Sequence, residues 1–227
     1  MPSEVICLYE LSGYAAAPWA EAGYKVFCYD KETSAERVEG NIIYLPWDAT
    51  DPAQNLALVQ RHRGKAVIVL AFPPCTDLAV SGARHFRDKR RKNPSFQIEA
   101  MQLVYIARDI AKELGAPYAI ENPVSMISSF WRKPDFIFDP YEFGGYLPED
   151  DQHPKWPSYI RARDAYPKKT CYWTGGGFVL PEKKRVPVRP GYSLQTKKLG
   201  GKSKKTKEIR SMSPRGIARA IYLANRK

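Results

Sequence analysis

One thiol and one carboxyl group each follow a short apolar run of the sequence. Cys75 comes after residues 66–72 and two prolines, and Glu121 comes directly after residues 116–120. Both runs have the length and composition of buried strands in a parallel sheet. Two parallel strands would bring both side chains to the carboxyl edge, where open α/β sheets bind ligands. A thiol nucleophile beside a carboxylic acid is the pair that chemistry on a pyrimidine ring would use.

The other apolar runs alternate with segments of helical spacing. Apolar residues that recur every three or four positions predict helices, and short apolar runs between turn residues predict strands. We expect strands over residues 5–8, 25–29, 42–45, 66–72, 116–120, 171–173 and 178–180, and helices over residues 18–22, 53–62, 96–114 and 214–225. This alternation predicts an α/β fold with a doubly wound, mostly parallel sheet.

Positive charge gathers in two segments of this 227-residue chain, whose formal net charge is +12 at pH 7. Either run alone is compatible with a solvated face, but two runs favour a polyanionic partner, and nucleic acid fits best. The first cluster comprises Arg84, Arg87, Lys89, Arg90, Arg91 and Lys92, and the second comprises Lys183, Lys184, Arg185, Arg189, Lys197, Lys198, Lys202, Lys204, Lys205, Lys207 and Arg210.

Other classes of protein find little support in the sequence. No stretch approaches the roughly 20 apolar residues of a membrane span, and the first residues lack the pattern of a signal peptide, so we expect a cytoplasmic protein. The four cysteines lie far apart without a Cys-x-x-Cys pair, and only three histidines are present, so we expect no metal. Cys7 and Cys28 lie in apolar runs and are expected to be buried, reduced thiols.

Taken motif by motif, the chain resembles the cytosine C5 methyltransferases, most closely the small phage-type DNA methylases without a large target-recognition domain. The ordered pair of Pro-Pro-Cys and Glu-Asn-Pro, each after an expected strand, carries this resemblance. It implies a Rossmann-like fold of the S-adenosylmethionine-dependent methyltransferase type. It also implies cytosine-containing DNA as the substrate, S-adenosylmethionine as the methyl donor and, for a phage-encoded enzyme, the host cytoplasm as the compartment.

Within this resemblance, Cys75 matches the family's nucleophile and Glu121 its acid. The thiolate would add to C6 of a cytosine flipped out of the duplex, and the resulting enamine would accept a methyl group at C5. Glu121 would engage N3 with a carboxyl group that holds a proton near neutral pH. Asn122 would fix the loop geometry, and Pro74 would help to shape the donor pocket. The alternatives are a buried structural thiol for Cys75 and a helix N-terminal acid for Glu121.

The family's glycine-rich donor loop has an altered counterpart in this chain. In the family, this loop lets the backbone approach the methionine part of S-adenosylmethionine. Alanines stand at positions 15 and 16, where glycines are usual. The residues that we expect to contact the donor here are Leu11, Ser12, Gly13 and Tyr14.

Further donor contacts are expected at the ends of the next two strands and near the end of the chain. Asp30, with Lys31 beside it, stands where the family's acid binds the ribose hydroxyls, a role also known from dinucleotide sites. Asp48 resembles the acid that contacts the adenine amine, and Ser211 belongs to a segment that resembles the family's last motif. The alternative for both aspartates is an ordinary turn.

Nucleic-acid contacts are expected from both basic clusters. The segment after Cys75 resembles the family's active-site loop, which closes over DNA and offers Ser81, Arg84 and Arg87 to phosphates. In the second cluster we select Lys198 and Lys202.

A third basic pair, Lys168 and Lys169, precedes a threonine and a tryptophan, as in small phage-type relatives. One of the two is expected to support O2 of the base, and the sequence leaves open which one. We place Lys169 with the catalytic residues and Lys168 with the nucleic-acid contacts. The alternative is an ordinary basic turn.

The resemblance also implies how the chain is divided into domains. Residues 1–181 would form the catalytic domain with a surface insertion at about 146–166, and residues 209–227 would return to it as a helix. Residues 182–208 would form a short, mobile basic loop in place of a recognition domain. Lysines give salt-sensitive, sequence-tolerant affinity, so we expect short or relaxed sequence specificity. The oligomeric state is open, with a monomer favoured.

Three other functions stay open at this stage. The substrate could be RNA, because one branch of the family methylates tRNA with the same cysteine chemistry. The altered glycine loop could accept a different donor for a related modification at C5. Finally, the chain could be a catalytically inert nucleic-acid-binding module that keeps the fold.

Overall fold

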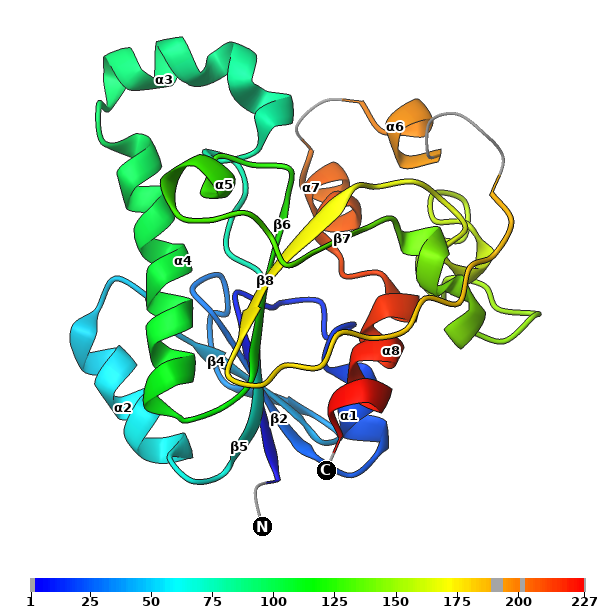
Figure 1. The fold of residues 1–227 in the computed structure, drawn as a ribbon, viewed down its shortest axis with the longest axis horizontal. Coiled ribbons are helices and arrows are strands. Elements are labelled where there is room, and N and C mark those ends of the chain that lie inside the picture. The colour runs from blue at the N-terminus through cyan, green and yellow to red at the C-terminus, as the bar shows by residue number, and fades with distance from the viewer. Residues whose placement is uncertain (1–2, 189–193, 201–202, 227) are drawn as a thin grey trace.

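One eight-stranded sheet forms the centre of the molecule, as Figure 1 shows for a computed structural model that describes residues 3–188, 194–200 and 203–226. The strand order is β3-β4-β2-β1-β5-β6-β8-β7. The strands are β1 (Glu4–Leu8), β2 (Lys25–Asp30), β3 (Arg37–Glu39), β4 (Ile42–Pro46), β5 (Ala66–Ala71), β6 (Tyr118–Pro123), β7 (Phe136–Phe138) and β8 (Thr170–Gly175).

The five central strands are parallel and confirm the expected α/β class. Reading across the sheet, β4, β2, β1, β5 and β6 pair in parallel, which is the 3-2-1-4-5 order of a doubly wound sheet. The winding reverses between β1 and β5, and crevices that bind ligands lie at such reversals. Antiparallel strands complete both edges, β3 on one side and β8 with β7 on the other.

Helices cover both faces of the sheet. The α-helices are α1 (Ala17–Glu21), α2 (Pro52–His62), α3 (Phe86–Lys92), α4 (Phe96–Glu113), α5 (Ile127–Phe130), α6 (Leu194–Lys198), α7 (Lys204–Ser211) and α8 (Arg215–Asn225), and 3₁₀ helices span Val80–His85, Pro140–Tyr146 and Ala162–Asp164. Buried residues of α2 and α4 belong to the core of one face, and those of α1 and α8 belong to the core of the other.

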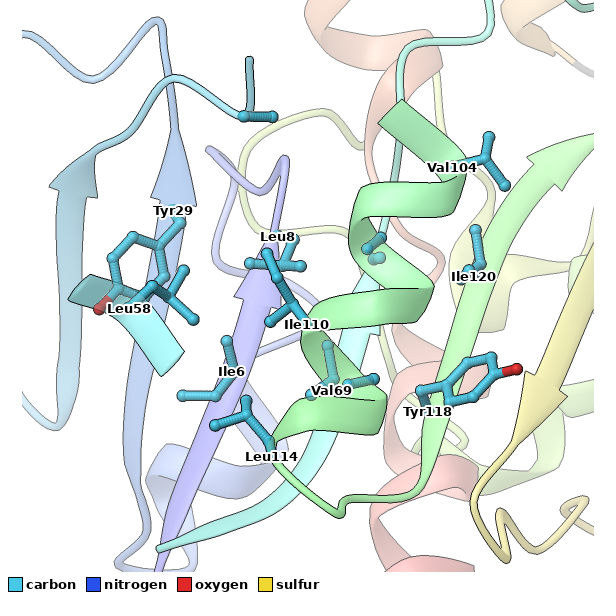
Figure 2. Packing of buried hydrophobic residues seen from close by; sticks show 14 of the residues in the cluster. Ile6, Leu8, Tyr29, Leu58, Val69, Val104, Ile110, Leu114, Tyr118 and Ile120 are labelled. Atoms are coloured by element: carbon cyan, nitrogen blue, oxygen red, sulfur yellow. The ribbon is translucent and has the colours of Figure 1, made fainter. Parts of the chain in front are cut away.

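Alternation along each strand divides the apolar residues between these two cores. Ile6 and Leu8 of β1 pack with α4, whereas Val5 and Cys7 point to the α8 side, because successive side chains of a strand face opposite ways. Figure 2 shows Ile6, Leu8 and Ile120 lying beneath α4. The strands are therefore buried on both faces, as parallel strands between two helical layers must be.

The buried carboxyl group of Asp164 caps the start of helix α8. Its N-cap, Pro214, offers no side-chain cap, and Asp164 Oδ2 instead accepts a hydrogen bond from Gly216 N at 2.8 Å. A Cβ on Gly216 would lie 2.5 Å from the Phe143 carbonyl oxygen. The missing side chain lets α8 approach the 3₁₀ helix Pro140–Tyr146 closely.

A third core cluster corrects the expectation for residues 182–208. We expected a mobile loop, but α6 lies within this segment and α7 begins in it. Leu199, directly after α6, and Ile209 of α7 are buried and pack with Ile160 and Tyr166 of the 146–166 insertion. The apolar residues of either segment alone are too few for a core, which is why composition pointed to a loop.

Three further expectations need correction. The segment 81–95, where we expected no helix, folds into the 3₁₀ helix Val80–His85 and into α3, because Lys and Arg favour helices even where no apolar stripe marks one. Residues 178–180 form no strand; Val179 N donates to the Asn225 side chain at 2.8 Å. The short elements β3, β7 and α5 were not expected, since three- or four-residue elements carry almost no periodicity.

The cysteines behave as expected for a reduced protein. Cys7, Cys28 and Cys171 are buried free thiols, and Cys75 is exposed. Across the described ranges, no helix has both the length and the apolar character to cross a bilayer.

Ile6→Ala is expected to lower the free energy of unfolding by about 2–5 kcal/mol, because it opens a cavity beneath α4. Ile6 is fully buried, whereas Leu56 on α2 is 59% exposed. The matched Leu56→Ala variant should therefore stay within about 0.5 kcal/mol of the parent protein. Equilibrium urea unfolding measures both, and equal losses would contradict this position of the core.

Candidate active site

A hydrogen bond joins strand β6, which carries Glu121, to the turn that leads to Cys75. Strands β5 and β6 pair with Ala71 opposite Ile120, so Glu121 lies one residue beyond this pair on β6, and Pro73 follows two residues after Ala71, where β5 ends. Asn122 Nδ2 donates to the Pro73 carbonyl at 3.0 Å, and Asn122 is fully buried. The loop-fixing role expected for Asn122 is confirmed.

A second set of bonds holds the chain on the far side of Cys75. The Cys75 carbonyl accepts from Leu78 N and Ala79 N at 3.0 and 2.8 Å. Beyond this turn, Val80 N donates to the Val124 carbonyl, and Met126 N donates to the Leu78 carbonyl. Cys75 is therefore held between the bond of Pro73 to β6 on one side and these bonds to the segment after β6 on the other.

The three titratable groups at this edge influence one another. Cys75 is exposed, yet enough protein surrounds its thiol that desolvation raises its pKa; ionised Glu121 raises that pKa further, and Lys168 lowers it. Burial likewise raises the pKa of Glu121, and Lys168 lowers it. Burial thus shifts a thiol and a carboxyl group toward their protonated forms, and both share one cationic neighbour.

Of the two adjacent lysines, Lys168 is the one that lies near this pair. Its ammonium acts on Cys75 and Glu121, whereas Lys169 acts on Cys171. Alternation explains the difference, because Cys171 belongs to the α4 side of the sheet and its neighbour Tyr172 to the α8 side. Asp139 Oδ1 fixes the backbone of Lys168 by accepting from its N–H at 2.7 Å.

On the donor side, the loop after β1 makes a turn that requires glycine. Gly13 has φ +74°, and a Cβ there would lie 2.3 Å from the Tyr44 hydroxyl. The two alanines that follow at positions 15 and 16 are buried, and Ala16 has right-handed helical angles. The loop therefore needs no glycine at position 16.

Glu10 is a site residue that our sequence reasoning missed. It directly follows β1 and Tyr9, is 4% exposed, and its Oε1 accepts three hydrogen bonds from Ser12 and Gly13. The available signal was an acid at the end of an apolar run, the same signal that identified Asp30. It was overlooked because the family's loop pattern assigns no role to this position.

The two aspartates expected to bind the donor differ in their surroundings. Asp30 ends β2 and is partly buried, and desolvation raises the pKa of its carboxyl group. Asp48 is exposed, and hydrogen bonds from Thr50 lower the pKa of its carboxyl group. Its Oδ1 accepts from both Thr50 N and Thr50 Oγ1, so Asp48 forms the turn that we had considered as its alternative role.

Most of the other residues expected to contact the donor are exposed. Leu11, Lys31, Pro74 and Ser211 are exposed, and Ser211 Oγ donates to the Glu208 carbonyl at 3.1 Å. The Tyr14 ring packs against His153 with centroids 5.1 Å apart and borders the third core cluster. Tyr14 thus connects the β1 loop to the 146–166 insertion.

The basic residues occupy two places beyond the carboxyl edge, α3 on one side and α6 with α7 on the other (Figure 1). Ser81, Arg84 and Arg87 are exposed, and an open hollow of about 350 Å³ lies along α3 between Phe86, Arg87, Arg90 and Arg91. Lys89 anchors α3 to the loop after Cys75 through Asp77 Oδ1 at 2.6 Å.

Helix α7 contacts both halves of the site. Lys207 forms an ion pair with Glu32, just beyond Asp30, and Lys168 Nζ donates to the Arg210 carbonyl at 2.7 Å. Lys198 is exposed, and its Nζ donates to the Ser158 carbonyl. Lys202 lies outside the described residues.

The chain matches no protein-family model and no curated protein. Its function must therefore be argued from the arrangement of its own residues.

The pH dependence of Cys75 alkylation is expected to change when either of its two charged neighbours, Glu121 or Lys168, is replaced. The thiolate is the reactive form, so Glu121→Gln should move the midpoint of the pH–rate curve for iodoacetamide to lower pH, and Lys168→Met should move it to higher pH. Lys169→Met is the matched control and should leave the midpoint unchanged. Mass analysis of peptides separates Cys75 from the three buried thiols, and equal shifts in both lysine variants would contradict the placement of Lys168.

Proposed function

We propose that this protein is a DNA cytosine C5 methyltransferase that uses S-adenosylmethionine. The observation that carries the proposal is the fixed pairing of Cys75 with Glu121 at the carboxyl edge, tied by the bond from Asn122 to the Pro73 carbonyl. The doubly wound order of the parallel strands supports the methyltransferase type of fold. The residues that resemble the family's motifs lie along this one edge.

Cys75 and Glu121 divide the chemistry on the base between them. The Cys75 thiolate adds to C6 of cytosine, and Glu121, whose pKa burial raises, donates a hydrogen bond or a proton to N3 as electrons move toward the ring. The enamine that forms is nucleophilic at C5. After the methyl group is gained, loss of the C5 proton and elimination of the thiolate restore the aromatic ring and the enzyme.

Lys168 serves this chemistry through its charge. A cation close to both groups favours the thiolate over the thiol, and so offsets the opposing effects of burial and of Glu121 on Cys75. Bonds from Asp139 Oδ1 and to the Arg210 carbonyl hold the lysine in place. We therefore assign the support of the base to Lys168 in preference to Lys169.

The donor half of the edge fits an adenosyl ligand that carries positive charge. S-adenosylmethionine, when bound, supplies an electrophilic methyl group. Asp30 ends β2 with one carboxylate oxygen bonded to Glu32 N, which suits it to hold ribose hydroxyls. The sharp turn at Gly13 lets the β1 loop pack against the Tyr44 hydroxyl, where a Cβ would not fit, and so fixes the path of the loop on the donor side.

The two basic regions on either side of the edge support the proposed binding of DNA. Exposed Arg84 and Arg87 and the residues of α3 suit phosphate contacts. A target base must leave the stack to reach a thiol at the sheet edge. Lysine and arginine side chains that contact phosphates give affinity that does not depend on sequence. We therefore expect relaxed sequence specificity.

Incubation with labelled S-adenosylmethionine and cytosine-containing DNA is expected to give 5-methylcytosine. Cys75→Ser should abolish transfer, and Glu121→Gln should reduce it by roughly 10²–10⁴-fold, the usual contribution of a positioned proton donor. Cys171→Ala, which removes a thiol on the other face of the sheet, should remain active. Nucleoside mass analysis of DNA and RNA substrates identifies the product; methylated RNA alone, or an active C75S variant, would refute the proposal.

Arg84→Ala combined with Arg87→Ala is expected to weaken DNA binding and to make it less sensitive to salt. The slope of log K against log[salt] falls by about 0.9 for each phosphate that the protein no longer neutralises. Arg63→Ala is the control, because Arg63 is exposed and pairs with Glu113 away from the carboxyl edge. Fluorescence anisotropy over a salt series measures both slopes, and identical slopes for the two variants would place the DNA elsewhere.

A further inference from the structure

The Glu10 carboxyl group lies at the point where the winding of the sheet reverses. It follows β1, whose neighbours on either side are β2 and β5, and ligands of doubly wound sheets bind at this reversal. Tyr9, between β1 and Glu10, has φ +60°. A positive φ is strained for a tyrosine and marks a backbone that the surrounding structure holds in place.

The two oxygens of this carboxyl group have different partners. Oε1 accepts from Ser12 N at 2.6 Å, Ser12 Oγ at 2.6 Å and Gly13 N at 2.9 Å. Backbone N–H groups that converge in a tight turn form an anion-binding nest, and here a side chain of the loop itself fills it. No donor among the side chains and backbone groups that the structure describes, which leave out the side chains of residues 196 and 197, bonds to Oε2.

The surroundings of Glu10 are anionic, although the chain as a whole carries +12. Burial raises the pKa of Glu10, hydrogen bonds from Ser12 and Gly13 lower it, and Asp30 from β2 raises it further. Glu10 in turn adds to the effect of burial in raising the pKa of Glu121 from β6. The other titratable groups that interact with Glu10 are Cys28 on β2 and Tyr172 on β8. Lys168 acts on Glu121, and Lys31 and Lys207 act on Asp30, but none of these cations bonds to Glu10.

We propose that Glu10 holds the β1 loop through Oε1 and binds an ammonium group of the ligand through Oε2. The inference rests on the proposed function, in which the ligand is S-adenosylmethionine, whose amino-acid part carries an ammonium group. Because the loop N–H groups are already occupied by Glu10, the carboxylate of that ligand must find its partners elsewhere. Glu10 thus selects for a cationic group at the place where a nest of free N–H groups would select for an anion.

Glutamine at position 10 separates the two roles. Its single oxygen must face Ser12 and Gly13, because an NH₂ group cannot accept their hydrogen bonds. The NH₂ group then takes the place of Oε2 and opposes an ammonium group. Glu10→Gln should therefore keep the loop and abolish the bond to the ligand, whereas Glu10→Ala should disrupt both.

Calorimetry with two probes tests the proposal. S-adenosylhomocysteine has the amino-acid part, and 5′-methylthioadenosine lacks it. Glu10→Gln should weaken binding of S-adenosylhomocysteine by about 10- to 150-fold, the loss expected for one charge-assisted hydrogen bond. The same variant should bind 5′-methylthioadenosine within about twofold of the parent protein.

The outcomes are distinct from those of the methyl-transfer assay. Unchanged binding of S-adenosylhomocysteine by E10Q would reduce Glu10 to a loop-holding residue and overturn the inference, as would an equal loss of both probes. A parent protein that binds neither probe would refute the proposed donor, and the inference with it. Binding by the parent protein without methyl transfer to DNA would refute only the proposed substrate.

Discussion

The hydrogen bond from Asn122 to the Pro73 carbonyl is the contact on which the site depends. Parallel pairing of β5 with β6 brings the turn after β5 to the edge where β6 carries Glu121, but it does not set the angle at which this turn leaves the sheet. The buried amide of Asn122 in β6 sets it by donating to the Pro73 carbonyl in the turn before Cys75. Thiol and carboxyl are therefore positioned from the same buried side chain.

The central sheet could be predicted because its signals are local. The apolar runs of β1, β2, β4, β5 and β6 and the long periodicity of α4 stand out without any tertiary information. Right-handed crossovers between parallel strands limit the possible strand orders, but they do not select 3-2-1-4-5 among them. The placement of Cys75 and Glu121 at one edge followed from these elements alone.

What escaped prediction depends on contacts between distant segments. Leu199 and Ile209 become a core only with Ile160 and Tyr166, residues that lie some distance earlier in the chain. The choice between Lys168 and Lys169 depends on which face of β8 each follows, and this requires the register of an antiparallel strand. Glu10 was missed because its importance comes from three bonds within a turn, and a motif comparison does not see such bonds.

The contact between α8 and α1 bears on how the chain folds as it is made. Ile217 and Ile221 of α8 share one core cluster with Val5 of β1, and the rings of Trp19 and Tyr222 meet edge to face at 5.2 Å. Nearly the whole chain separates these partners in sequence, and non-local contacts of this kind slow folding. During synthesis, the part of this sheet face that α8 covers stays open until α8 itself has been made, because α1 alone covers only its neighbouring part.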